Sequence, residues 1–116
     1  MPDHTRLVRD YLEALHSGRH ARARELLADD LDYHDPMMTV RDADDLIRQV
    51  EGFGGAANTE IREVVGHGDV VAALTTFLSP QARAIPFSQW FRIEDGRIAS
   101  IRVIYDPRPF IEMMEG

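Results

Sequence analysis

The sequence predicts an α+β domain in which a curved antiparallel sheet wraps against helices. Two observations support this fold class. Apolar residues recur at helical spacing through most of the first half of the chain, and from Asn58 onward they alternate with polar residues in long runs separated by turn residues. Helices grouped before a run of β-hairpins indicate an α+β fold, because the hairpins build a sheet that buries one face against the helices.

The N-terminal part of the chain predicts two helices. The first helix has an apolar stripe, with Asp3 or Thr5 able to cap its start and Gly18 able to end it. The stripe consists of Leu7, Val8, Tyr11, Leu12 and Leu15. A second, shorter helix fits residues 21–28, and the basic run at residues 18–25 is interpreted as a solvated helix face.

The stretch LDYHDP at residues 31–36 changes the period from helical to two, which predicts a short strand. Alternation directs Leu31, Tyr33 and Asp35 to one side of the strand and His34 to the other, until Pro36 breaks the pattern. Asp35 is therefore expected to point inward, together with Leu31 and Tyr33.

Residues 42–53 predict a third helix, and the rest of the chain predicts four strands. Asp42 and Asp45 form an acidic helix start, an apolar stripe follows, and the glycine cluster GFGG stops it. Residues 59–79 form one hairpin pair around a turn at 66–69, and residues 82–106 form a second pair around a turn at 94–96. The glycine cluster lacks the Lys and Ser/Thr of a phosphate loop, so it is interpreted as a helix stop.

Length and composition predict one domain over residues 1–116 and exclude several functional classes. The chain has no cysteine, which rules out disulfides, thiolate nucleophiles and thiolate metal sites. Its net charge of -7 argues against nucleic-acid binding, and no stretch approaches the ~20 apolar residues of a membrane span. Neither His34 nor His67 has the spacing of a metal site, and no His pair at i, i+4 lies near an acidic ligand on a convincing site, so no metal is expected. Since the N-terminus lacks a signal-like apolar region, a cytoplasmic location is the default expectation.

The strand around residues 84–93 contains the most informative polar residue. Its inward face is expected to present Gln89 among four apolar side chains, those of Ile85, Phe87, Phe91 and Ile93. A buried amide without hydrogen-bond partners costs about 1 to 3 kcal/mol, so Gln89 needs either a fixed partner or a cavity with water or ligand in it. A glutamine satisfied inside the core is as well supported as a functional one.

Four further polar side chains are candidates for the site. Tyr11 lies in the middle of the first helix's apolar stripe, so its hydroxyl needs a partner if the ring is buried. Apolar surroundings would raise the pKa of an inward Asp35, as a general base near neutral pH requires, but the residues alone favour turn chemistry for Asp35 and Pro36. Tyr105 and Asp106 stand at the exit of the last strand, and Tyr105 by itself is typical of an amphipathic core residue.

Two long stretches of the chain resemble a known family. LVRDYLEALHSGRHARARELLADDLDYHDP at residues 7–36 and IPFSQWFRIEDGRIASIRVIYDPRPF at residues 85–110 resemble the opening and the closing strands of ketosteroid isomerase and polyketide-cyclase-like (SnoaL-like) members of the nuclear transport factor 2-like superfamily. The resemblance implies a cone-shaped α+β fold, in which a curved antiparallel sheet wraps around three N-terminal helices and encloses a pocket. It also implies dimerisation through the outer face of the sheet.

The resemblance assigns roles to individual residues. In ketosteroid isomerases a tyrosine of the first helix donates a hydrogen bond to the substrate oxygen, and an aspartate just before a proline shuttles the proton; these match Tyr11 in RDYLEAL and Asp35 in HDP. The second oxyanion donor, a protonated aspartate, falls on or near Gln89, whose neutral amide is a weaker donor, and this departure disfavours steroid isomerisation. Cyclase-like members often use an acidic residue near the end of the last strand, which matches Asp106. Epoxide hydrolases need an arginine between two aspartates, and Arg102 is expected to point away from that face.

The leading hypothesis is a small isomerase- or cyclase-like enzyme that works without a cofactor on an apolar carbonyl compound. Asp35 would be the base, which Asp106 could replace or assist, and Tyr11 and Gln89 would donate to the oxyanion. The pocket wall would consist of Tyr33, Phe53, Phe87, Phe91, Val103 and Tyr105.

The competing hypothesis is a non-catalytic small-molecule-binding or interaction module on the same fold, because fold does not determine function. Both hypotheses include a homodimer. Trp90, with Ser88 and Arg92 beside it on the outer face, predicts a dimer surface, since an exposed aromatic side chain on a sheet suggests a partner.

Overall fold

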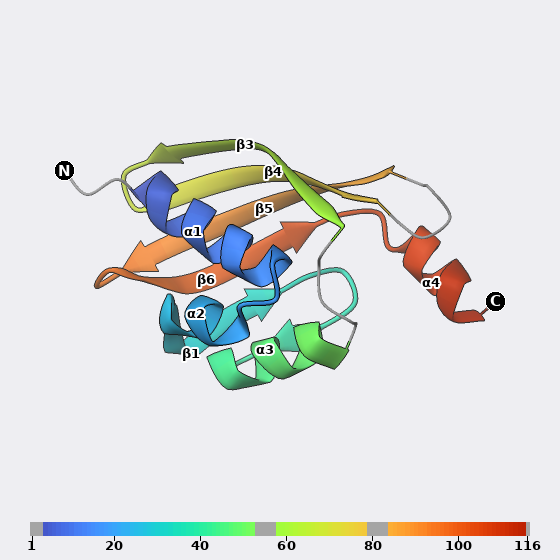
Figure 1. Cartoon of the computed structure of the whole chain (residues 1–116), viewed down its shortest axis with the longest axis horizontal. Helices are drawn as coiled ribbons and strands as arrows, with labels where there is room; N and C mark the ends of the chain where they lie inside the picture. Colours follow the sequence, from blue (N-terminus) through green and yellow to red (C-terminus); the bar gives the residue numbers. More distant parts are fainter. Residues whose placement is uncertain (1–3, 53–57, 79–83, 116) are drawn as a thin grey trace.

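A computed structural model of the chain describes residues 4–52, 58–78 and 84–115 (Figure 1). Four helices and six strands lie in these ranges. In chain order they are α1 (His4–His16), α2 (His20–Glu25), β1 (Leu27–His34), β2 (Thr39–Val40), α3 (Ala43–Gly52), β3 (Thr59–His67), β4 (Val70–Leu78), β5 (Ala84–Glu94), β6 (Arg97–Ile104) and α4 (Arg108–Glu115). None of these helices has the length and apolar character needed to cross a membrane.

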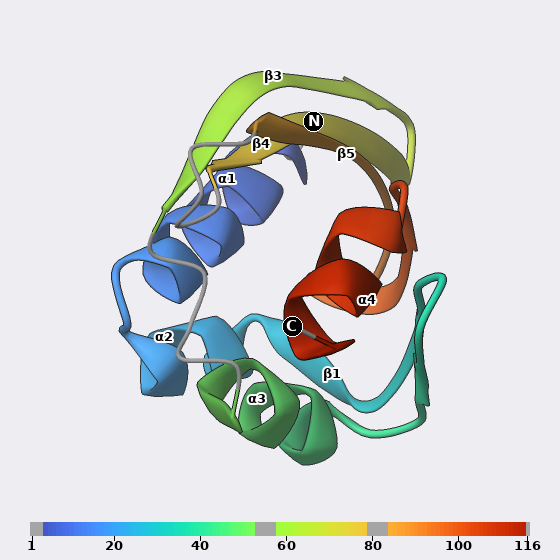
Figure 2. The same ribbon diagram turned by 90° about the vertical axis from the view of Figure 1, so that its right-hand side faces the viewer.

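The six strands form one sheet in the order β2-β1-β6-β5-β4-β3. Neighbouring strands are antiparallel, except that β1 runs parallel to β6. Figure 2 shows the sheet curving around α1, which lies beneath β3 and β4, while α3 lies beside β1. This arrangement confirms the predicted α+β fold with a curved sheet wrapped around helices.

The core forms where the apolar stripe of α1 meets the concave face of the sheet. Val8, Tyr11 and Leu12 are buried, and the Tyr11 ring meets the Phe91 ring of β5 edge-on, with centroids 6.1 Å apart. Each large apolar side chain that is fully buried in this way contributes about 1.5 to 3 kcal/mol. The amphipathic pattern of the first helix is therefore explained by this packing.

Alternation along β5 follows the prediction. Ile85 and Phe91 are buried and Gln89 is half-buried on the inward side, whereas Trp90 and Arg92 are exposed on the outward side. Residues 84–92 of the strand pair with β4 and residues 88–94 pair with β6, and this pairing fixes which residues face the interior.

The boundary between α2 and β1 differs from the prediction. The sequence predicts a helix through residue 28, but α2 ends at Glu25 and β1 begins at Leu27. Leu27 is fully buried and pairs with Ile98 of β6, whose N–H donates to the carbonyl oxygen of Leu26 at 2.9 Å. Long-range strand pairing and burial thus outweigh the local helical spacing.

Two elements were not predicted from the sequence. β2 has only two residues and pairs with the end of β1. α4 follows the turn at Pro107, and three of its apolar side chains, Phe110, Met113 and Met114, have helical spacing. Figure 1 shows α4 at the same end of the molecule as the C-terminus, away from the start of α1.

Candidate functional site

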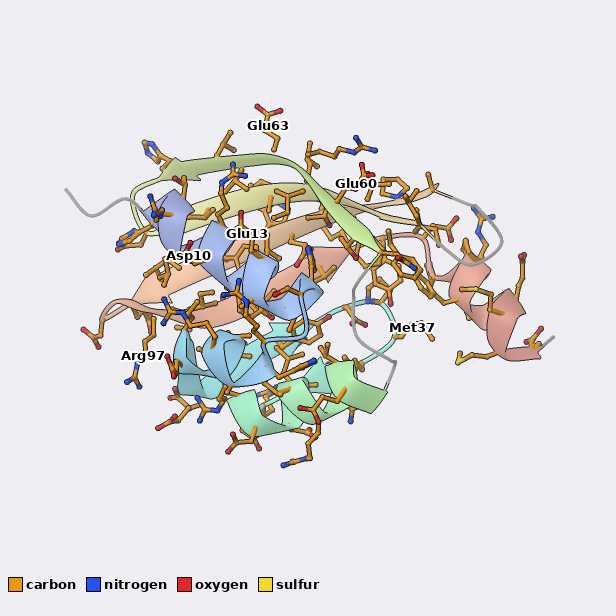
Figure 3. All side chains as sticks on the ribbon, in the orientation of Figure 1. Asp10, Glu13, Met37, Glu60, Glu63 and Arg97 are labelled. Atoms are coloured by element: carbon orange, nitrogen blue, oxygen red, sulfur yellow. The ribbon has the colours of Figure 1, made fainter. Side chains whose placement is uncertain are left out.

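A cavity of about 450 Å³ lies between the concave face of the sheet and the helices. Its lining comes from α1, α3, α4, the five strands β1, β3, β4, β5 and β6, and the loop between β1 and β2, where Met37 lies (Figure 3). Its volume is in the range of small-molecule sites. The other residues labelled in Figure 3 are charged, and none of them belongs to the cavity lining.

Asp35 contributes a carboxylate to this cavity, and both of its oxygens accept hydrogen bonds. Oδ1 accepts from the backbone N–H groups of Met37 and Met38 at 2.7 and 2.9 Å, and the Asp35 N–H donates to the Met38 carbonyl oxygen at 3.0 Å. Oδ2 accepts from the Tyr33 hydroxyl at 2.6 Å. One oxygen therefore closes the turn, and the other bonds to a side chain of the cavity.

Three tyrosines of the cavity lie close to this carboxylate or to one another. Burial and the hydrogen bond to Asp35 raise the pKa of Tyr33, and the nearby Tyr11 raises it further. Burial and the charge of Asp35 raise the pKa of Tyr105 to about 12. Burial also raises the pKa of Tyr11, so all three phenols are neutral hydrogen-bond donors near pH 7.

The Tyr11 hydroxyl has no hydrogen-bond partner within the described ranges, although its side chain is buried and lines the cavity. Gln89, by contrast, has one: its Nε2 donates to Oγ1 of Thr75 on β4 at 3.0 Å. This bond uses one of the two amide protons and leaves the other, together with the amide oxygen, for a ligand. Tyr11 and Gln89 thus offer two donors in one cavity.

The part of the cavity toward α4 is aromatic. The rings of Phe87 and Tyr105 stack with centroids 4.4 Å apart, and Phe110 of α4 meets them edge-on at 6.0 and 5.3 Å. Phe77 stacks on Phe110 at 5.7 Å. These rings suit an apolar ligand, since apolar groups gain free energy when such a surface removes them from water.

The described lining contains one carboxylate, Asp35, and no arginine. The chain has 13 arginines and no lysine, so no lysine is available to neutralise an anionic ligand. Among residues 4–52, 58–78 and 84–115 no group of three His, Asp or Glu side chains lies close enough to hold a metal ion.

The family model of the SnoaL-like domain matches residues 8–101, which is most of the chain. The chain belongs to the SnoaL-like domain family. No curated protein sequence matches the chain significantly. The match confirms the predicted SnoaL-like resemblance.

Solved structures share the fold of this SnoaL-like domain. An NTF2-like protein of unknown function from Cytophaga hutchinsonii is 22% identical, with a TM-score of 0.82 over 92% of this chain and 94% of that chain. A Kribbella flavida protein provisionally named a ketosteroid isomerase is 16% identical, with a TM-score of 0.79 over 86% and 75% of the two chains. An LEH-like epoxide hydrolase from M. tuberculosis is 22% identical, with a TM-score of 0.72 over 92% and 85%. At these identities the likeness establishes the NTF2-like fold.

The SnoaL-like domain brings most of the predicted site residues to the cavity, namely Tyr11, Tyr33, Asp35, Phe87, Gln89, Val103 and Tyr105. Phe91 was expected on the cavity wall, but it is buried in the core against the Tyr11 ring. Asp106 is also absent from the lining. It was a candidate through the family resemblance, but strand alternation places it on the face opposite Tyr105, and its Oδ2 accepts from Nη2 of Arg108 at 2.7 Å near the surface. Phe53 lies outside the described residues.

His16 and the methionines of the cavity were not predicted. His16 follows Leu12 by four residues on the buried side of α1, so helical spacing could have indicated it. Burial lowers the pKa of His16, and its ring has no hydrogen bond or ion pair to another described residue. The methionines of the lining are Met37, Met38, Met113 and Met114, two in the loop after β1 and two in the unpredicted α4.

Proposed function

We propose that this SnoaL-like domain is a small enzyme that removes a proton next to the carbonyl group of a neutral, apolar molecule without a cofactor. The observation that supports it best is the pairing in one cavity of a carboxylate, Asp35, with a buried donor, the Tyr11 hydroxyl, that has no hydrogen-bond partner among the described residues. A base and an oxyanion donor are the two groups that enolisation needs.

The proposed step balances as follows. The Cα–H bond of the ligand breaks, Asp35 takes the proton, and the electron pair moves into the carbonyl to give an enolate. The Tyr11 hydroxyl and the free N–H of Gln89 donate to the enolate oxygen, which is more basic than the ketone oxygen, so their bonds strengthen as charge develops. In a ligand whose enolate is conjugated with a C=C bond, Asp35 returns the proton to the far carbon and completes an isomerisation. If the enolate carbon instead attacks a second carbonyl within the ligand, a C–C bond forms, the second carbonyl's π bond breaks, and the alkoxide takes the proton from Asp35 to complete a cyclisation.

The charges of the cavity favour a neutral ligand. A ligand carboxylate or phosphate would stand near the Asp35 carboxylate, and none of the described lining residues is an arginine that could offset the repulsion. The aromatic rings toward α4 and the four methionines favour apolar groups, because methionine adapts its shape to an irregular ligand surface.

The test is the exchange of the α-protons of 2-tetralone, a neutral aromatic ketone that enolises, followed by NMR in D2O. Asp35→Asn is expected to slow the protein-catalysed exchange by at least 100-fold, because removal of a positioned general base costs about 10² to 10⁴. Asp30→Asn is the matched control, since Asp30 lies exposed on the same strand. Equal exchange by the wild type and Asp35→Asn would show that Asp35 is not the base.

The alternative function is a binding module without catalysis. It is favoured by the hydrogen bonds that already hold the Asp35 carboxylate in its turn and Gln89 against Thr75, since paired polar groups are typical of structural sites. Binding of 2-tetralone to the cavity, seen by chemical-shift changes at Tyr11 and Tyr105, without faster exchange of its α-protons would support this alternative.

We also propose that two copies of the domain pair through the outer face of the sheet. Trp90 is 47% exposed there, and Leu74 and Ile104, which lie in register with Ser88 between them, are 52% and 61% exposed. The Trp90 indole N–H donates to Ser88 Oγ at 3.0 Å, and Arg92 is exposed next to them. A second copy is the partner that offers an apolar patch of the same kind.

Equilibrium sedimentation at micromolar concentration tests the homodimer. The wild type is expected to sediment as a dimer and Trp90→Glu as a monomer, because a carboxylate would be buried in the apolar interface. Glu94→Gln is the control, since Glu94 is an exposed residue at the end of the same strand. A monomeric wild type would refute the interface.

A further inference from the structure

Tyr33 makes the shortest hydrogen bond of the cavity. Its hydroxyl donates to Asp35 Oδ2 at 2.6 Å, which is the length of a bond between a hydroxyl and an ionised carboxylate. The N–H groups of Met37 and Met38 occupy Oδ1. A carboxylate has about four acceptor sites, so three donors leave about one lone pair free to accept a proton from a ligand.

The residue that donates this hydrogen bond, Tyr33, is held by strand pairing on both sides. Tyr33 lies inside the sheet, where it pairs with Val40 of β2 on one side and with Ile101 of β6 on the other. Asp35 follows it by two residues, so strand alternation places both side chains on the cavity side. Both carboxylate oxygens are thereby held, Oδ1 by backbone N–H groups of the turn and Oδ2 by the Tyr33 hydroxyl from the sheet.

We propose that Tyr33 is a positioning residue that acts through Asp35, holding Oδ2 toward the ligand and favouring the ionised carboxylate. This inference rests on the proposed function, because it assigns Tyr33 a role in the same proton transfer. The raised pKa of Tyr33 is consistent with it, since a phenol that stays protonated through the neutral range remains a donor to the carboxylate. A tyrosine that only formed part of the cavity wall would not need a hydrogen bond to Asp35.

The first test needs no substrate. A hydroxyl proton held in a short bond to a carboxylate resonates far downfield and exchanges slowly with water, so the wild type is expected to show such a proton by NMR. Tyr33→Phe is expected to lose it, and so is Asp35→Asn, because an amide oxygen is a weaker acceptor than a carboxylate. Circular dichroism checks that both variants fold. A downfield proton that survives in Asp35→Asn would overturn the inference.

The second test is the pH dependence of 2-tetralone exchange. Tyr33→Phe removes a hydrogen-bond donor to the carboxylate, so the acidic limb of its profile is expected to lie at higher pH than that of the wild type. Tyr11→Phe is the matched control: it removes a hydroxyl from the same cavity without touching Asp35, so it should lower the rate and leave the limb in place.

The outcomes separate the two proposals. A slower Tyr33→Phe protein with an unmoved limb would overturn the positioning role of Tyr33 while leaving Asp35 as the base. An Asp35→Asn protein as fast as the wild type would overturn the proposed function itself. A shifted limb in Tyr33→Phe but not in Tyr11→Phe, with the downfield proton lost in both Tyr33→Phe and Asp35→Asn, would support the inference.

Discussion

Phe110 anchors α4 to the rest of the domain, so Phe110→Ala is expected to release this helix. None of the residues of α4 is fully buried, and a helix of eight residues is not stable by itself in water. Its attachment depends on the Phe110 ring, whose centroid lies 5.3 Å from Tyr105, 5.7 Å from Phe77 and 6.0 Å from Phe87.

The size of the effect follows from these contacts. Three aromatic pairs at the lower end of their usual range contribute about 1.5 kcal/mol together, and half-burial of the ring contributes about 1 kcal/mol more. A loss of about 2.5 kcal/mol corresponds to a roughly 70-fold rise in the population of detached α4. Because α4 can detach locally, most of the change should appear in this helix and not in the core.

Amide hydrogen exchange of residues 108–115, followed by mass spectrometry, measures this opening. Protection of the segment is expected to fall about 70-fold in Phe110→Ala, while that of β5 and β6 changes little. Ile111→Ala is the control, since Ile111 is 39% exposed on the same helix and has no ring contact. Unchanged protection in Phe110→Ala, or an equal loss in Ile111→Ala, would refute the anchoring by the aromatic cluster.

Two further predictions concern packing and pH. A Cβ at Gly66 would lie 2.8 Å from Cγ2 of Thr5. Gly66→Ala should therefore lower the free energy of unfolding, measured in urea, by about 1 to 3 kcal/mol. The same substitution should cost little in a Thr5→Ser background, which lacks that methyl group, and equal costs in both backgrounds would contradict the clash. Burial lowers the pKa of His16, so its NMR titration midpoint should lie below the usual 6.5. The folded state then binds fewer protons than the unfolded state, and His16 adds stability above about pH 6.5 that is lost as the pH falls; His16→Gln should show a weaker loss, and an equal loss in both proteins would contradict the assignment.

The inward positions of the strands were predictable because alternation has a period of two and long pairing fixes it. Gln89, Phe87 and Val103 reached the cavity for this reason. Asp106 became a candidate through the family resemblance and not through this rule, since alternation places it on the face opposite Tyr105, where its carboxylate pairs with Arg108. Alternation thus predicts the direction of side chains even just beyond the end of β6, because Tyr105 lines the cavity and Asp106 is exposed.

Features that depend on contacts between distant parts of the chain were harder to predict from the sequence. Phe91 shares the inward face with Gln89, but α1 covers it, and strand alternation cannot distinguish the core from the cavity on one face. Leu27 has helical spacing, yet it pairs with Ile98, 71 positions along the chain, and joins β1. His16 could have been predicted only by extending the helical spacing of the apolar stripe to a polar residue. It lies in the cavity because of its position on α1, and not because histidine is apolar.

The two interpretations of Asp35 that the sequence left open describe different atoms of one side chain. Turn chemistry explains Oδ1, which accepts from the N–H groups of Met37 and Met38, and it accounts for an aspartate before a proline. It does not explain Oδ2, which accepts from Tyr33 in a cavity that also contains the Tyr11 hydroxyl. An aspartate needed only for the turn could keep its second oxygen in water, at no desolvation cost. The bond to a half-buried tyrosine therefore favours a role for this carboxylate in the cavity beyond the turn.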